Sequence, residues 1–163
     1  MPSETFRTIG IDPGSRVTGI GVGAGPLGAR LVAIHQRIQA VIDRFQPASG
    51  AIEKVFVSAN PQSALVLGQA RGSALLALAQ SELEISEYSA LEIKRAITGT
   101  GRAGKEQVQH MVRVLLGMDR NPAQDAADAL ACAICHLHHA ESRLRQTVAG
   151  VSVLAEDAGG ARR

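Results

Sequence analysis

The stretch IGIDPGSRVTGIGVG, from Ile9 to Gly23, carries an aspartate inside an apolar run that otherwise resembles a buried strand. Val, Ile and Thr recur along residues 8–22, so we expect a strand that turns at the DPGS tetrapeptide and then continues. Burying an unpaired carboxylate in such a strand is costly in free energy. Asp12 therefore lies at a hydrated strand end, caps the turn, or holds a cation.

The rest of the chain alternates between helical and strand patterns. Residues 29–45 place apolar side chains at three- and four-residue spacing, which is typical of an amphipathic helix. Asn60 and Pro61 provide the cap and the first position of a second helix. We expect helices at 29–45, 60–82, 89–98, 105–117 and 121–144, and strands at 49–57 and 83–88. This alternation predicts one α/β domain with parallel strand pairing over residues 1–146, followed by a disordered tail at 147–163.

The composition is that of a globular chain of 163 residues with a formal net charge of +2, too weak by itself to indicate a nucleic-acid partner. The longest apolar stretch is interrupted by Gln69 and Arg71, so we expect no membrane span and no membrane partner. The N-terminal residues lack the basic and apolar regions of a signal peptide. Two closely spaced cysteines fit a reducing compartment, so we expect a cytoplasmic protein.

Four carboxylates occupy apolar or strand-end settings: Asp12, Glu53, Asp125 and Asp128. Taken singly, Glu53 could point to solvent from a sheet edge, and Asp125 suits the dipole of a first helical turn. Asp128 lies deeper among alanines and shares a helix face with Asp125. If strand ends bring the four together, divalent cations would offset their repulsion, and oxygen ligands suit Mg²⁺ or Mn²⁺. Two such ions roughly 3.5–4 Å apart support phosphodiester cleavage.

Five motifs follow one another over roughly Thr8 to His136: GIDPGSRVTGIGV, AIEKVF, SALVLGQARG, KEQVQHMVRVLL and NPAQDAADALA. In their residues and their order they resemble the RuvC family of Holliday junction resolvases. The resemblance implies an RNase H-like fold with a mixed sheet flanked by helices. It also implies a homodimeric endodeoxyribonuclease that nicks two opposed strands of a four-way DNA junction with Mg²⁺, in recombination and repair.

The same resemblance assigns roles to individual residues. The catalytic and metal-binding carboxylates would be Asp12, Glu53, Asp125 and Asp128, with two Mg²⁺ per subunit and Mn²⁺ as a substitute. Lys94 and Lys105 would face the scissile phosphate, Lys105 with a catalytic role, and Phe56 would stack at the junction centre. We expect DNA contacts from Phe56, Arg71, Lys94, Arg102 and Lys105. The partners would be four-way junction DNA, a second copy of the chain and the RuvA–RuvB branch-migration complex. Small residues along 64–80 permit close helix packing, in the core or across a dimer two-fold.

One segment departs from the family pattern. The family has a hairpin of two further strands between the first strand and the first helix. Here the segment between Val22 and Arg30 consists of little more than GAGPLG. We therefore expect a shortened hairpin, which would leave the first strand at a sheet edge.

Three alternative functions compete with the nuclease. Gly23, Gly25 and Gly28 spell G-x-G-x-x-G before a helix, as in a dinucleotide-binding domain, although Pro26 interrupts the motif. Cys132 and Cys135, with three nearby histidines, have the residue types of a zinc site. The sequence contains no second pair of cysteines to complete such a site. Packing in the core explains the two cysteines as well. The histidines could equally form a solvated helix end. An inactive or non-catalytic junction-binding relative would keep the fold and use the acids structurally.

Overall fold

The computed structural model describes residues 7–13, 25–55 and 60–159, with side chains in the last helix described as far as residue 147. Three strands form a parallel sheet in the order β1 (Thr8–Ile11), β2 (Ser49–Glu53) and β3 (Glu84–Tyr88). In this register Ile11 lies opposite Ile52, and Glu53 lies opposite Tyr88. The carboxyl ends of all three strands therefore meet at one edge of the sheet.

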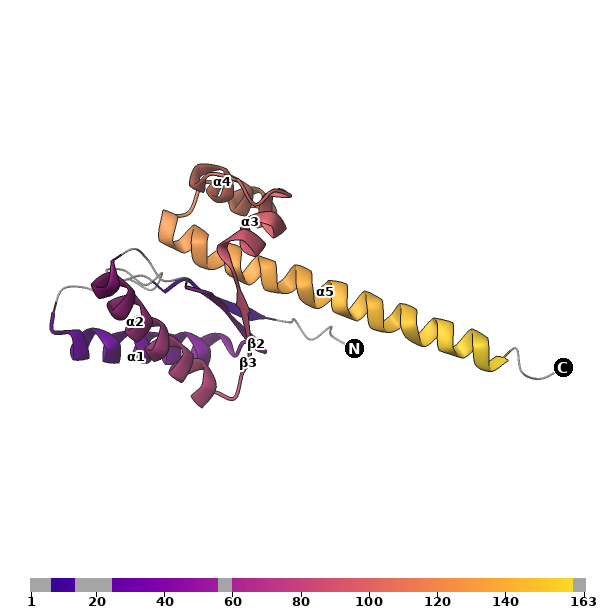
Figure 1. Cartoon of the computed structure of the whole chain (residues 1–163), viewed down its shortest axis with the longest axis horizontal. Helices are drawn as coiled ribbons and strands as arrows, with labels where there is room; N and C mark the ends of the chain where they lie inside the picture. The colour runs from indigo at the N-terminus through magenta and orange to yellow at the C-terminus, as the bar shows by residue number, and fades with distance from the viewer. Residues whose placement is uncertain (1–6, 14–24, 56–59, 160–163) are drawn as a thin grey trace.

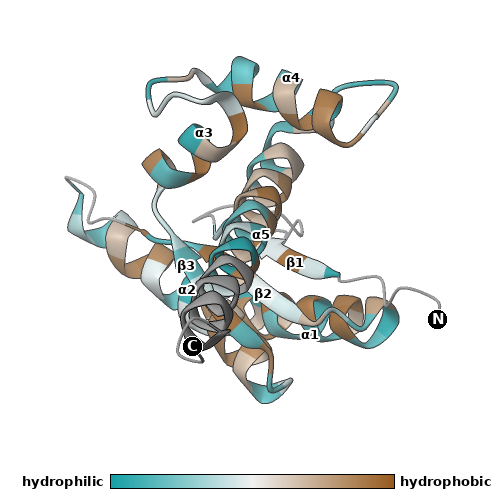
Figure 2. Cartoon of the chain, turned by 90° about the vertical axis from the view of Figure 1, so that its right-hand side faces the viewer, coloured by the Kyte–Doolittle hydropathy of each residue, from teal (hydrophilic) through white to brown (hydrophobic). Residues whose placement is uncertain are grey.

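Helices cover both faces of this sheet (Figures 1 and 2). Helices α1 (Leu27–Phe45) and α2 (Pro61–Gln80) pack on one face, over Ile11 and Ile52. The long helix α5 (Gln124–Gly159) crosses the other face, over Ala51. Helices α3 (Ala90–Thr98) and α4 (Lys105–Leu115) pack against the first part of α5 and complete the second core. This architecture confirms the α/β fold class expected from the sequence.

Local signals in the sequence fix the starts of helices α2 and α3. The Asn60 side chain accepts hydrogen bonds from the backbone N–H groups of Gln62 and Ser63, at 3.0 and 3.3 Å, and so caps α2. Ser89 and Glu92 form a reciprocal capping box at the start of α3. The expected start of the last helix at residue 121 is wrong, because α5 begins at Gln124.

Strand β1 and helix α5 approach each other at Gly10 without an intervening side chain. A Cβ atom at this position would lie 2.1 Å from the backbone oxygen of Ala129 and 2.9 Å from Cβ of Ala133. Only glycine fits here, because any other residue would push the helix away from the strand. The contact sets the distance between the end of β1, which leads to Asp12, and the turn of α5 that carries Asp128.

A chain of buried polar groups crosses the core beneath α5. The hydroxyl of Tyr88 lies 3.0 Å from Nδ1 of His136, whose Nε2 lies 2.9 Å from the Ser49 hydroxyl. Ser49 in turn donates to the Thr8 hydroxyl at 3.0 Å. The interpretation of all three histidines as a solvated helix end is therefore wrong for His136, which is 1% exposed.

Cys132 and Cys135 are free thiols packed in the same core. Burial raises the pKa of both thiols, to about 11 for Cys135. A neutral buried thiol is a poor zinc ligand, since the metal binds the thiolate. Core packing is thus the role that the structure gives to these cysteines, in agreement with the simpler of the two sequence interpretations.

Two sequence expectations concern the ends of the described segments. The shortened hairpin falls mainly on residues 14–24, outside the described residues, and the strands described are all parallel. The backbone of α5 continues as a helix to Gly159, whereas the sequence predicts a disordered tail from residue 147. The division into a domain and a tail stays a prediction. Within the described segments, no helix is both long and apolar enough to traverse a bilayer.

Candidate active site

A pocket of about 270 Å³ opens where the carboxyl ends of β1 and β2 meet the first turns of α5. Asp12 directly follows β1, Glu53 ends β2, and Asp128 lies in the second turn of α5. The parallel register and the Gly10 contact bring these three acids together from distant parts of the chain. The lining residues are Asp12, Glu53, Ala90, Ile93, Lys94, Lys105, Val108 and Asp128.

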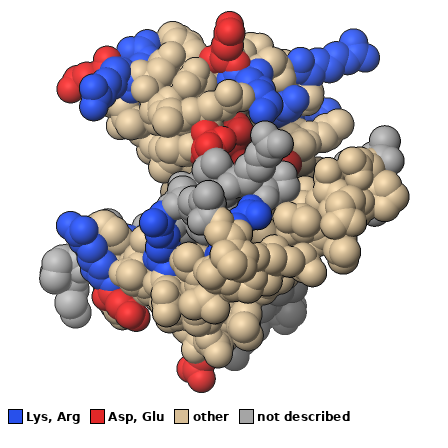
Figure 3. Space-filling view, turned by 90° about the vertical axis from the view of Figure 1, so that its left-hand side faces the viewer, with Lys and Arg blue, Asp and Glu red and all other residues tan. Residues whose placement is uncertain are grey.

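Two lysines face the acids from the opposite wall of the pocket. Lys94 is half-buried on α3, and Lys105 is the first residue of α4, directly after the Gly-rich loop. The positive charge of Lys105 acts on all three acids and opposes the rise in their pKa values. Figure 3 shows acidic side chains gathered in the middle of the face of the molecule that it displays, with basic side chains close to them. The pocket thus presents both signs of charge at short range.

The pKa values of the Asp12 and Glu53 carboxyl groups are both raised above their ordinary values. Burial is the main cause that raises the pKa of Glu53 to about 7, and the neighbouring charge of Asp12 is the next. Burial and the charge of Asp128 raise the pKa of Asp12 as well. In this arrangement the neutral Glu53 carboxyl donates a hydrogen bond to the Asp12 carboxylate. Such a pair is typical of two acids that are too close to ionise together without a compensating cation.

The fourth expected acid, Asp125, is placed differently. Its side chain is exposed, one turn before Asp128 on α5, and it does not line the pocket. Its charge nevertheless raises the pKa of both Asp12 and Asp128, so it lies within electrostatic range of them. The structure therefore brings three of the four acids into one pocket and leaves Asp125 at its rim.

The expected DNA-binding residues are spread around this site. Lys94 and Lys105 line the pocket, and Arg102 is exposed in the loop between α3 and α4. Phe56 lies outside the described residues. Arg71 makes an ion pair with Glu87 and donates from Nε to the backbone oxygen of Glu53 at 3.2 Å.

Glu87 is a site neighbour that sequence reasoning missed. It lies on β3 directly before Tyr88, in a strand to which the sequence pattern assigns no site residue. The sequence offers one indication of its role: Glu87 lies near the end of a strand that pairs in parallel with the strand of Glu53. Its pairing with Arg71 could not be predicted from spacing, because the two residues are 16 positions apart on different elements.

The residues of the pocket decide whether it fits a divalent metal ion. Carboxylate oxygens are the ligands that Mg²⁺ and Mn²⁺ prefer, and no sulfur or imidazole ligand lines the pocket. Among the described residues, no three His, Cys, Asp or Glu side chains are placed so that they could hold a metal ion together. The carboxylate oxygens are thus the type of donor that a hard cation prefers, although their arrangement among the described residues does not gather three of them around one ion. Such a cation would offset the repulsion that contributes to the raised pKa values of Asp12 and Glu53.

Acids at the ends of parallel strands, faced by lysines and enclosed by helices, define an α/β nuclease of the RNase H-like class. The model of the family described as crossover junction endodeoxyribonuclease RuvC matches residues 20–136. The chain belongs to this family.

Individual relatives agree with the family match. A crossover junction endodeoxyribonuclease RuvC from Marinobacter nauticus is 46% identical, covering 89% of this chain and 93% of the relative. Another from Magnetococcus marinus is 49% identical, covering 83% of this chain and 86% of the relative. A solved structure of Thermus thermophilus RuvC is 31% identical with a TM-score of 0.72, covering 83% of this chain and 95% of the other. The same protein in complex with a Holliday junction substrate gives a TM-score of 0.76 at 31% identity, covering 83% of this chain and 94% of the other.

The comparisons also bear on the shortened hairpin. The match to the Marinobacter nauticus relative extends over 163 positions, yet it involves only 89% of this 163-residue chain. The difference means that the relative has residues without a counterpart here. The family match begins at residue 20, near the segment where the sequence departs from the family pattern. Glu53, Asp125 and Asp128 lie inside the matched range, whereas Asp12 lies before it.

Proposed function

We propose that this protein resolves four-way DNA junctions by metal-dependent hydrolysis of phosphodiester bonds. The observation that carries the proposal is the pocket in which Asp12, Glu53 and Asp128 face Lys94 and Lys105. Family membership and the likeness to a RuvC bound to a Holliday junction support the choice of substrate. A cytoplasmic location, expected from the two closely spaced cysteines, remains a prediction. Cooperation with the RuvA–RuvB complex remains a prediction that follows from the family.

Asp12, Glu53 and Asp128 are the proposed ligands of one or two Mg²⁺ ions, with Asp125 joining them from the rim. When bound, the metal would activate a water molecule and stabilise charge on the phosphate. To act as anionic ligands together, Asp12 and Glu53 would both be deprotonated, and a bound cation would favour that state by offsetting their repulsion. Lys94 and Lys105 hold the phosphate against the acids and stabilise the charge that develops on its oxygens.

DNA contacts extend beyond the pocket. Arg102 is exposed in the loop that leads to Lys105, so it can pair with a neighbouring phosphate. The proposed role of Phe56 is to stack on a base at the junction centre, a contact worth about 1–3 kcal/mol. A direct DNA contact by Arg71 remains a prediction, although its guanidinium group already has protein partners.

The two coordinated nicks of junction resolution require two active sites, which a two-fold dimer provides. The outer face of α1 and α2 carries exposed apolar side chains: Val32 is 54% exposed, Leu65 57% and Leu76 53%. Between them, a Cβ atom added at Gly68 or Gly72 would meet no heavy atom within 4 Å, so a second helix could approach closely. We propose this face as the interface between two copies.

A cleavage assay tests the proposed function. A junction with fixed arms and a linear duplex of the same sequence are incubated with Mg²⁺ or with EDTA. We expect paired nicks in the junction only, and none with EDTA. The variants Asp12→Asn, Glu53→Gln and Asp128→Asn should lose most of their rate yet bind the junction at least as tightly, because removing a negative charge favours phosphate binding.

Two outcomes would contradict the proposal. Equal cleavage of duplex and junction would remove the selectivity for structure. Tight junction binding without cleavage under any metal would identify a non-catalytic relative. The variant Asp125→Asn compares the acid at the rim with the acids in the pocket. We expect it to lose less of the cleavage rate than Asp128→Asn does.

A further inference from the structure

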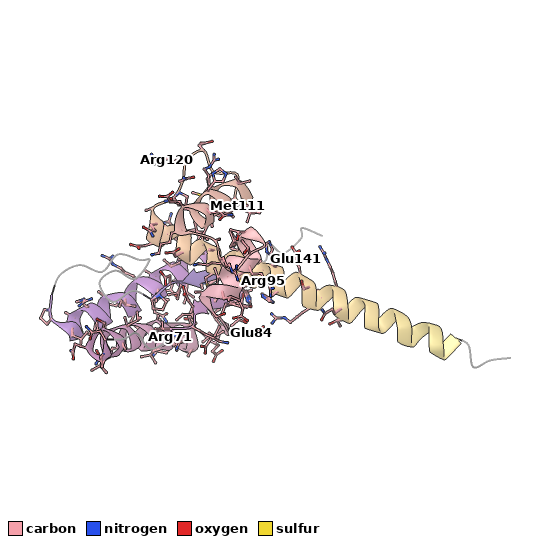
Figure 4. All side chains as sticks on the ribbon, turned by 45° about the horizontal axis from the view of Figure 1, so that its top comes forward. Arg71, Glu84, Arg95, Met111, Arg120 and Glu141 are labelled. Carbon is pink, nitrogen blue, oxygen red and sulfur yellow. The ribbon has the colours of Figure 1, made fainter. Side chains whose placement is uncertain are left out.

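Arg71 joins three elements at the point where β2 ends. It extends from α2 (Figure 4). Its Nε donates to the backbone oxygen of Glu53 at 3.2 Å, and its terminal nitrogen pairs with Glu87 on β3. Its side chain is 20% exposed, whereas that of Glu87 is 43% exposed. One guanidinium group thus connects a helix, a catalytic strand end and the adjacent strand.

Lys54 continues the pairing of the strands past the end of β2. Its N–H donates to the Tyr88 oxygen at 2.7 Å. The oxygen of Glu53 is satisfied by Arg71. A shift of the main chain at Glu53 would move its Cα atom and with it the Glu53 carboxyl group relative to Asp12, so the bond from Arg71 to the Glu53 backbone oxygen limits the motion that matters for the site.

Only an arginine can serve both partners in this geometry. The guanidinium group is planar and offers several N–H donors in fixed directions, so one edge can reach a carbonyl while another reaches a carboxylate. A lysine ammonium could keep the charge pair with Glu87, but it would not hold the carbonyl of Glu53 at the same time.

We propose that Arg71, held by Glu87, is a positioning residue that fixes the backbone of Glu53 and keeps its carboxyl in the pocket. The inference rests on the proposed nuclease function of that pocket. It assigns to Arg71 a task other than DNA contact and gives Glu87 a part in catalysis without any contact to substrate. Residues that orient a metal-binding group affect activity by about 10- to 100-fold when they are replaced.

Three variants separate positioning from DNA contact: Arg71→Ala, Arg71→Lys and Glu87→Gln. We expect each to lower the single-turnover cleavage rate about 10-fold or more, with junction affinity unchanged. Glu87→Gln is the sharpest case, because it removes a negative charge and cannot weaken phosphate attraction. In the Arg71→Ala background, Glu87→Gln should have no additional effect, since both act through one contact.

The other ion pair in the described part of the chain supplies matched controls. Arg145 and Glu141 lie 3.6 Å apart on α5, with side chains 83% and 65% exposed. Arg145→Ala and Glu141→Gln make the same changes in charge away from the pocket, so we expect wild-type cleavage rates.

A second measurement does not depend on cleavage. Amide hydrogen exchange at Lys54 should be faster in Arg71→Ala and Glu87→Gln than in the wild type or the controls, because the end of β2 loses a restraint. This result would support the positioning role even if the wild-type protein cut no junction. The inference is overturned if Arg71→Ala weakens junction binding as much as it slows cleavage, or if Glu87→Gln retains both the wild-type rate and the wild-type exchange at Lys54.

Discussion

Replacing Glu53 by glutamine should make the metal-free protein more stable at pH 8 while it removes cleavage. Burial, followed by the charge of Asp12, raises the pKa of Glu53 from its ordinary value of 4.5 to about 7. Between these pH values the folded protein keeps a proton that the unfolded chain releases. The free energy of unfolding therefore falls as the pH rises through this range, and below pH 4.5 the effect is absent.

The size of the effect follows from the same shift. At about 1.36 kcal/mol for each pH unit, the full shift corresponds to roughly 3 kcal/mol. Because Glu53 is only partly buried, solvent screening reduces this to about 1–2 kcal/mol. The glutamine amide can donate to Asp12 as the protonated acid does, so Glu53→Gln should recover this amount at pH 8.

Urea unfolding at pH 4.5 and pH 8, in EDTA and in Mg²⁺, measures the difference between variant and wild type. We expect equal stabilities at pH 4.5 and a more stable variant at pH 8 in EDTA. Mg²⁺ should remove the advantage by binding the native wild-type site. Glu141→Gln, which alters an exposed acid, should change the stability by less than about 0.5 kcal/mol at either pH. A Glu53→Gln protein that is no more stable than wild type at pH 8 would refute the raised pKa of Glu53.

Three further predictions concern the core and the outer face. Gly10→Ala should cost several kcal/mol or leave the protein unfolded, because its Cβ would meet the backbone of Ala129; a thermal melt close to that of wild type would contradict this contact. Burial, with a contribution from the charge of Arg143, lowers the pKa of His136 in the folded protein. The unfolded chain therefore gains this proton first, and the free energy of unfolding should decline as the pH falls below about 6.5. His136→Gln should flatten that decline in urea titrations, and an unchanged slope would assign it to another group. Leu76→Glu should shift the mass measured by light scattering from dimer to monomer with little loss of stability, since Leu76 is 53% exposed; a persistent dimer would place the interface elsewhere.

Periodicity and capping residues were sufficient to predict the elements of the fold. The three- and four-residue spacing of apolar side chains in α1 matches the burial of Ile34, Ile38 and Ile42, whereas Phe45 at the end of the helix is 50% exposed. The cap at Asn60 also formed as expected. These signals are local, because each depends on residues within a few positions of one another.

The expected site was reached by a different kind of argument. The acids at Asp12, Glu53 and Asp128 were grouped because parallel strands end at one sheet edge, and the structure places them in one pocket. The partners of individual polar groups could not be predicted in this way. The pairing of Arg71 with Glu87, and the enclosure of His136 by Tyr88 and Ser49, depend on how distant elements pack. The start of α5 at Gln124 is a similar case, since the Pro122 carbonyl accepts a hydrogen bond from Gln109 of α4 outside the helix.

The bare contact at Gly10 has a consequence for how this chain tolerates change. Where an interface is made of interlocking side chains, a substitution that alters volume shifts the elements relative to each other. Here the spacing of β1 and α5 is set by main-chain atoms, which are the same whatever the sequence, together with the small side chain of Ala133. Substitutions among the apolar residues of the two cores can thus accumulate with little effect on the distance between Asp12 and Asp128. Relatives with divergent interiors would then keep one catalytic geometry, with glycine at this position as the condition.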